Sequence, residues 1–260
     1  MAAILNYDDH LGTETVKIYI GPKRKVFVMH RKPLFAAAPY FERAMRQREE
    51  KHGKLYLPHD HCGAFALFVE WIYRTVLPDG HSQDYVDSLY ELYMFAEKIS
   101  LSSPTLEDRI MDKIQDISLK YDLTPSLHMI HRIYESPADG RTIKSSALRD
   151  FCMQSFLYKH LLKADLGNSE EYKNAKGQEL DAVHAICRDN PRLFKDYIVW
   201  THLNLSNGTF GDPRERREDN PLDRCYFHAH MEGFPCHLTP IDKPDFIGKE
   251  HEKKGVRTTR

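Results

Sequence analysis

Hydrophobic and polar positions alternate in two short runs near the start of the chain. Val16, Ile18 and Ile20 form the first run, and residues 26–29 (VFVM) form the second. A period of two residues is typical of half-buried β-strands, and the Gly-Pro turn between the runs favours a hairpin. A third strand is expected at 54–58 (KLYLP), where the proline ends it.

After Pro33 the apolar residues recur every three or four positions, which indicates helices. This spacing predicts helices over residues 33–47, 62–75, 83–99, 106–117, 145–162, 179–188 and 191–203, and one more that follows Thr124 as its N-cap. The order strand, strand, helix, strand, helix, followed by further helices, predicts an α+β fold in which a helical cluster caps a small sheet.

The pattern divides the chain into three parts. Residues 14–120 contain the expected strands and the first helices, and residues 121–205 are expected to form an all-helical unit. From 206 to 260 glycine, proline and charged residues interrupt every periodicity, and little apolar material remains to be buried. We therefore expect two folded units followed by an irregular tail.

Five short motifs follow one another between residues 26 and 73. They are VFVMH at 26–30, Leu34, PYF at 39–41, LYLP at 55–58 and FALFVEWIY at 65–73. In this order and spacing they resemble a BTB/POZ domain, in particular the type found in many filamentous-fungal proteins. The resemblance covers about two fifths of the chain, and it implies a BTB/POZ fold with a small mixed sheet over residues 14–120.

The resemblance also implies a function. BTB/POZ domains are protein-binding platforms that pair with themselves and in some members recruit the cullin scaffold of a ubiquitin ligase. On this chain the resemblance assigns pairing to the first helix, with Phe35 and Tyr40 as candidates, and a cullin-facing position to Glu49. Members that bind cullins often carry a hydrophobic residue two positions before that glutamate, where this chain has Gln47. We therefore expect an adaptor or scaffold with protein partners. A second copy of the chain and a cullin scaffold are the two candidate partners.

Two polar residues beside the strands are interpreted as structural. His30 stands where the second strand meets a helix, and its imidazole can hydrogen-bond there to nearby backbone or to a carboxylate. Asp60 lies in HDHC, between a strand and a helix, and is expected to be the N-cap of that helix.

Candidate metal chemistry is concentrated in the tail. Cys225, His228, His230 and Cys236 lie within a dozen positions, and thiolates and imidazoles are the ligands that zinc prefers. His228 and His230 project to one side of an extended segment, so the four residues can close a tetrahedral site. The alternative is a tail that docks through aromatic residues such as Tyr226 and Phe227, with the cysteines and histidines as bystanders or with a Cys225–Cys236 disulfide. The stretch DPRERREDNPLDRCYFHAH also resembles the C-terminal tail of fungal BTB proteins.

Composition narrows the function classes. With 37 Lys and Arg against 38 Asp and Glu, the formal charge of −1 disfavours non-specific binding to nucleic acid or to an anionic membrane. Five scattered cysteines and the lack of a signal peptide or a long apolar run favour an intracellular protein, cytoplasmic or nuclear. The familiar phosphate-loop, GxSxG and HExxH signatures are absent. We therefore expect no enzyme and no small-molecule substrate, and a zinc-dependent regulator whose tail contacts a partner or nucleic acid is the alternative function.

Overall fold

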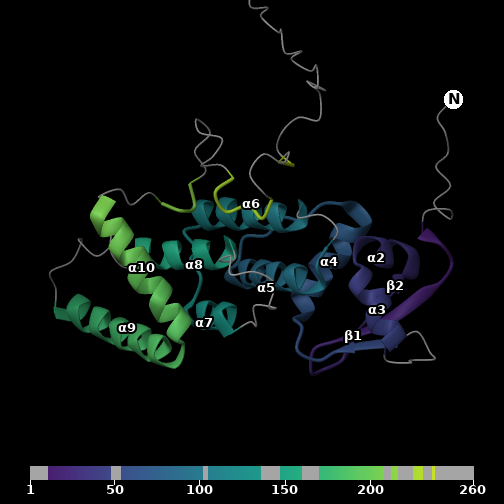
Figure 1. Cartoon of the computed structure of the whole chain (residues 1–260), viewed down its shortest axis with the longest axis horizontal. Helices are drawn as coiled ribbons and strands as arrows, with labels where there is room; N and C mark the ends of the chain where they lie inside the picture. Colours follow the sequence, from purple (N-terminus) through teal and green to yellow (C-terminus); the bar gives the residue numbers. More distant parts are fainter. Residues whose placement is uncertain are drawn as a thin grey trace, which may run out of the picture.

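The computed structural model places a small sheet at one end of the molecule and helices over the rest (Figure 1). The residues that it describes are 11–47, 54–101, 105–135, 147–159, 170–207, 212–215, 225–230 and 236–237. This arrangement confirms the α+β class. One continuous hydrophobic core runs from Val16 in the first strand to Phe227 in the tail.

The sheet has three strands in the order β2-β1-β3. Strand β1 (Thr15–Ile20) pairs antiparallel with β2 (Lys25–His30) and parallel with β3 (Lys54–Leu57). Gly21 begins the β1–β2 turn with a φ of 71°, in the left-handed region that glycine adopts without steric cost. The hairpin and the third strand therefore form where the alternation predicts them, and the sheet is mixed.

One face of the sheet is buried against helices. Val16, Ile18 and Ile20 of β1 are fully buried on this face. Behind them lies an aromatic cluster formed by Phe41, Phe65, Phe68 and Phe95. Phe68 and Phe95 approach edge to face with ring centroids 5.4 Å apart, a geometry that aromatic pairs prefer.

The helix expected over 33–47 is divided in two. Helix α2 (Arg31–Ala37) ends at Ala37, and Ala38 separates it from α3 (Pro39–Gln47). Ala38 has the extended angles φ −142° and ψ 98°, because a following proline disfavours the helical conformation of the residue before it. The apolar spacing continues across the break, which is why periodicity alone predicted one helix.

Two predicted helix caps are wrong. The N-cap of α4 (Cys62–Arg74) is His61, whose Nδ1 accepts from the backbone N–H of Ala64 at 3.4 Å. The carboxylate of Asp60 instead pairs with Lys98, with Nζ at 2.8 and 2.7 Å from its two oxygens. The hydroxyl of Ser126, two residues after Thr124, accepts from the N–H of Met129 in the first turn of α7 (Leu127–Glu135). In both places the side chain of a nearby residue accepts from a free N–H group of the first turn, in place of the residue that the sequence predicted.

The remaining helices are α5 (Gln83–Ile99), α6 (Thr105–Lys120), α8 (Ala147–Leu157), α9 (Glu170–Asp189) and α10 (Pro191–Asn207). Helix α9 begins nine residues earlier than the predicted 179. Its first half has no regular apolar stripe, but it is rich in Glu, Lys, Ala and Gln, which favour helix by intrinsic propensity. In the described part of the chain no helix combines the length and the apolar character that a membrane crossing requires.

Helix α6 is buried on more than its apolar face. Leu106, Ile110 and Ile114 belong to the core, as their spacing predicts. Its polar side chains are also buried, and these are Glu107, Asp108, Asp112, Gln115 and Ser118. Segments of the tail lie along this helix (Figure 1). The side of α6 that carries Asp108, Asp112 and Gln115 therefore faces the described tail segments and not solvent.

Glu107 gives a prediction about stability. Burial raises the pKa of its carboxyl from 4.5 to about 7, and the nearby carboxylates of Asp108 and Glu97 add to this rise. Because the pKa is higher in the folded protein, this group contributes full stability below about pH 4.5 and loses it as the pH rises to about 7. We expect Glu107→Gln to stabilise the protein above neutral pH by about 3 kcal/mol relative to wild type.

Urea unfolding of both proteins at about pH 5 and about pH 8 measures this difference, which should be larger at the higher pH. Asp116→Asn, a change to an exposed carboxylate of the same helix, is the matched control. An equal effect of Glu107→Gln at the two pH values would contradict the prediction.

Candidate metal centre

The described tail segments dock on α6 through polar contacts. Gln115 donates from Nε2 to the carbonyl of Pro213 at 2.9 Å, and the backbone N–H of Ala229 donates to Oδ1 of Asp108 at 2.5 Å. Phe227 adds an apolar contact to these polar ones. Its side chain is buried, and its ring centroid lies 5.4 Å from that of Phe151. Of the two aromatic residues expected to dock the tail, Phe227 does so, whereas Tyr226 is 55% exposed.

The contact of Phe227 also explains how the local chain brings Cys225 and His228 together. Residues 225–228 form a turn that closes with the N–H of His228 donating to the carbonyl of Cys225 at 3.0 Å. Phe227 points into the core from this turn. The two residues at the ends of the turn thus lie close to each other, with His228 buried and Cys225 half-buried.

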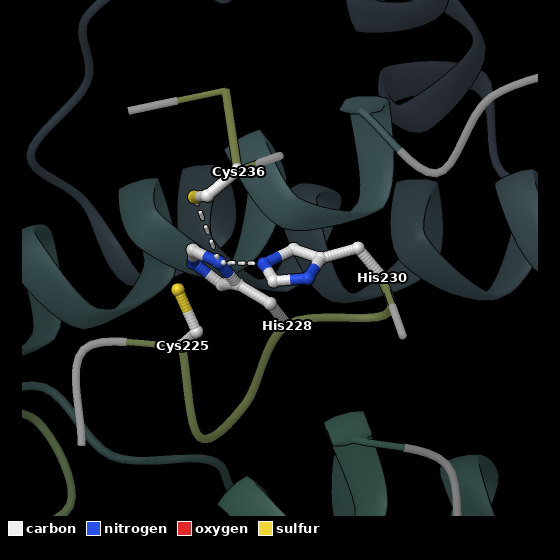
Figure 2. A group of neighbouring side chains, drawn as sticks. All are labelled: Cys225, His228, His230 and Cys236. Atoms are coloured by element: carbon white, nitrogen blue, oxygen red, sulfur yellow. Dashed lines mark hydrogen bonds between the residues drawn. The ribbon is translucent and has the colours of Figure 1, made fainter. Parts of the chain in front are cut away.

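Four potential ligand atoms converge at this turn (Figure 2). One sulfur or nitrogen atom from each of Cys225, His228, His230 and Cys236 lies within 4.8 Å of all the others. Nδ1 of His228 is 3.3 Å from Nε2 of His230 and 3.5 Å from Sγ of Cys236. The structure therefore brings together the same four residues that the sequence proposed as ligands.

These separations match the edges of a small tetrahedron. With Zn–N bonds of about 2.0–2.1 Å and Zn–S bonds of about 2.3 Å, two nitrogen ligands stand about 3.3 Å apart, and nitrogen and sulfur about 3.5 Å apart. The two measured distances from His228 Nδ1 have these values. The donor set, two thiols and two imidazoles, is also one that structural zinc sites use.

The protein around the cluster disfavours a free thiolate. Burial, the hydrogen bond with Cys236 and the nearby carboxylates together raise the pKa of the Cys225 thiol to about 11. A bound divalent cation reverses this effect, because a coordinating thiol is deprotonated. All five cysteines lie in the described residues and are free thiols, so Cys225 and Cys236 form no disulfide.

Asp112 lies behind the cluster, on α6. Its Oδ1 is 3.1 Å from Nε2 of His228, and its Oδ2 is 2.9 Å from Nε2 of His237. A carboxylate that accepts from the far nitrogen of a ligating histidine is a common feature of metal sites. A second group within metal-ligand reach, Asp108, His228 and His237, shares His228 with the first.

A second contact holds the tail at the other end of α6. Arg214 is only 6% exposed, and its guanidinium pairs with Asp212, also 6% exposed, and with Asp122. Its Nη1 also donates to the carbonyl of Ser118 in the last turn of α6. A cation is favourable there, because the free carbonyls give the C-terminal end of a helix a partial negative charge.

The other predicted site residues lie elsewhere. Phe35 in α2 and Tyr40 in α3 are half-buried against the core, and Glu49 falls outside the described residues. His30 is at the junction of β2 and α2, where its backbone N–H donates to the hydroxyl of Tyr73 and its Nδ1 is 3.0 Å from the same oxygen. The structural role of His30 is therefore confirmed, with a tyrosine as its partner in place of backbone or carboxylate.

Sequence reasoning did not identify Asp108, Asp112 or Arg214. The two aspartates stand four positions apart on a helix, where charged residues are normally taken for a solvated face. A weak signal existed in the regular spacing of Asp108, Asp112 and Gln115 on one side of α6. Only the burial of these side chains shows that another segment of the chain covers this side of α6.

Comparisons of the chain with protein-family models, with curated proteins and with solved structures found no match. The BTB/POZ resemblance therefore stays a prediction made from the motifs. The candidate metal centre is supported by the geometry of its four residues and not by a relative.

The contact at Arg214 gives a second prediction. Arg214→Met leaves the buried carboxylate of Asp212 without its cation, which we expect to destabilise the docked tail by about 3 kcal/mol. Hydrogen exchange of backbone amides in residues 212–215 measures this loss directly. Arg188→Met, which removes an exposed arginine paired with Asp189, is the matched control and should have almost no effect. Unchanged exchange in Arg214→Met would show that the pair does not hold the tail.

Proposed function

We propose that this protein is a non-enzymatic protein-interaction module of the BTB/POZ type whose C-terminal tail is held by a structural zinc ion. The observation that carries the proposal is the convergence of four sulfur and nitrogen atoms within 4.8 Å of one another, with tetrahedral values for the two separations from His228 Nδ1. The BTB/POZ part is supported by the motif series of residues 26–73 and by a mixed sheet with an aromatic helical cluster behind it.

Zinc suits this site better than the other common divalent cations. Magnesium and calcium prefer oxygen ligands, whereas thiolates and imidazoles in a tetrahedron favour zinc. Four protein ligands leave no open position for a substrate or a water molecule, which is the arrangement of a structural site. Zinc binding also supplies folding free energy, and the tail has few apolar residues of its own to provide it.

We expect the purified protein to contain one zinc ion per chain. Cys236→Ser or His228→Ala should abolish stoichiometric zinc, because each removes one of four ligands. Atomic absorption of the dialysed protein measures the metal content.

Cys62→Ser is the control for this experiment. Cys62 donates from Sγ to the carbonyl of Ile20, far from the tail in sequence, and a serine hydroxyl can keep that contact. The control should therefore retain its zinc. A wild-type protein that takes up no zinc when it is refolded with the metal would refute the site.

Protein binding is supported by apolar side chains left on the surface. Phe194, Ile198 and Val199 of α10 are each 44–51% exposed, and the first two are four residues apart on one face. Val26 and Val28 are 49% and 57% exposed on β2, at the edge of the sheet. Clustered apolar side chains on a surface are typical of sites of protein contact.

In this role the module acts as an adaptor or scaffold. Its candidate partners are a second copy of itself, as the resemblance implies, and a cullin-type scaffold at Glu49, where Gln47 replaces the hydrophobic residue that cullin-binding members often carry. Nucleic acid is disfavoured as a partner by the formal charge of −1. A zinc-dependent regulator is the second candidate function, favoured by the same four-ligand group; its partner contacts would require the metal.

Affinity purification of the tagged protein from its own cells tests these roles. A ligase adaptor should recover a cullin from wild type and not from Glu49→Lys, because the substitution reverses the charge at the contact. Glu70→Lys, a charge reversal on α4, is the control and should leave recovery unchanged. An untagged second copy in the eluate reports self-association.

The same purification after chelation separates the two candidates. A scaffold of the BTB/POZ type keeps its partners without zinc, whereas a zinc-dependent regulator loses them. Recovery of no protein partner under any of these conditions would contradict both.

A further inference from the structure

Asp112 of α6 links two histidines of the tail to one sulfur atom. Its two carboxylate oxygens contact Nε2 of His228 and Nε2 of His237, at 3.1 and 2.9 Å. The opposite nitrogen of each ring faces Sγ of Cys236, at 3.5 Å for His228 and 3.8 Å for His237. The four residues thus form a closed ring of contacts on one side of the ligand group.

We infer that Asp112 is the positioning residue of the metal site, and that zinc binds with full affinity only while the tail lies on α6. This inference rests on the proposed zinc site, and it adds that the contacts of Asp112 with the tail control the affinity of that site for zinc. Asp112 itself is not a ligand, because both of its oxygens are occupied by histidine nitrogens.

The geometry shows how the carboxylate acts on His228. An ionised carboxylate only accepts hydrogen bonds, so its contact places the ring proton of His228 on Nε2. The lone pair of the neutral ring then lies on Nδ1, the atom that faces His230 and Cys236. His228 is held in the tautomer and orientation that a metal requires, and its side chain is completely buried there.

The second oxygen of Asp112 orders the other end of the site. Through His237 it fixes the residue that directly follows the ligand Cys236. Asp112 therefore positions ligands from two separate stretches of the tail, 225–230 and 236–237. It also precedes His228 by 116 positions, so the tail alone cannot supply it.

Zinc binding and tail docking are consequently coupled. The carboxylate on α6 strengthens zinc binding, and by thermodynamic reciprocity zinc strengthens the contact of the tail with α6. A loss of zinc should release residues 225–230 and 236–237 from the helix, starting at the Asp112 contacts.

Competition with a chromophoric chelator measures the zinc affinity of the full chain and its variants. Asp112→Ala should bind zinc about 10- to 100-fold more weakly than wild type. Asp112→Asn keeps the size of the side chain and one acceptor oxygen, so its loss should be smaller. Both should keep one zinc per chain and the wild-type absorption spectrum with Co²⁺, since the four ligands remain. Asp116→Asn, on the exposed side of α6, should bind zinc as wild type does.

Hydrogen exchange at saturating zinc distinguishes a role of Asp112 in positioning the ligands from a role in folding of the chain. In a positioning role the amides of α6 keep wild-type protection in both Asp112 variants, and at limiting zinc only residues 225–230 and 236–237 exchange faster. Unchanged zinc affinity in Asp112→Ala, or loss of α6 protection in both variants at saturating zinc, would overturn the inference and leave the zinc site standing. A wild-type chain that binds no zinc would instead remove the site and the inference together.

Discussion

The polar side of α6 is the constraint on which the C-terminal part of the structure depends. The helix buries an apolar stripe in the core, and on another side it buries the carboxylates of Glu107, Asp108 and Asp112. A buried carboxylate is costly unless it is hydrogen-bonded or paired. The tail supplies such partners for two of them, a backbone N–H for Asp108 and two imidazoles for Asp112.

The tail depends on α6 in return. In its described segments Phe227 is the aromatic side chain that reaches the core, and the remaining contacts are polar. Polar contacts contribute little net free energy each, because they replace hydrogen bonds to water. In the proposed site, a metal ion bound by four side chains of these segments would add a much larger contribution.

Two regions of the molecule carry different parts of the proposed function. Helices α2 and α3, beside the sheet, contain the residues that the BTB/POZ resemblance assigns to pairing, whereas the described tail segments lie along α6 (Figure 1). One core connects them from Val16 to Phe227. In the proposed site, zinc would act on the packing of the tail against the helical part.

The sequence by itself determined the features that depend on residues close together in the chain. The alternation of Val16, Ile18 and Ile20 located the first strand, and the apolar spacing from Val86 to Ile99 located α5 at its observed bounds. The four candidate ligands were also readable, because they lie within a dozen positions. Only the tertiary structure decided that Asp112 faces two of the tail histidines, 116 and 125 positions away. Periodicity reports which side of a helix is apolar, but a polar side looks the same whether water or another segment of the chain covers it.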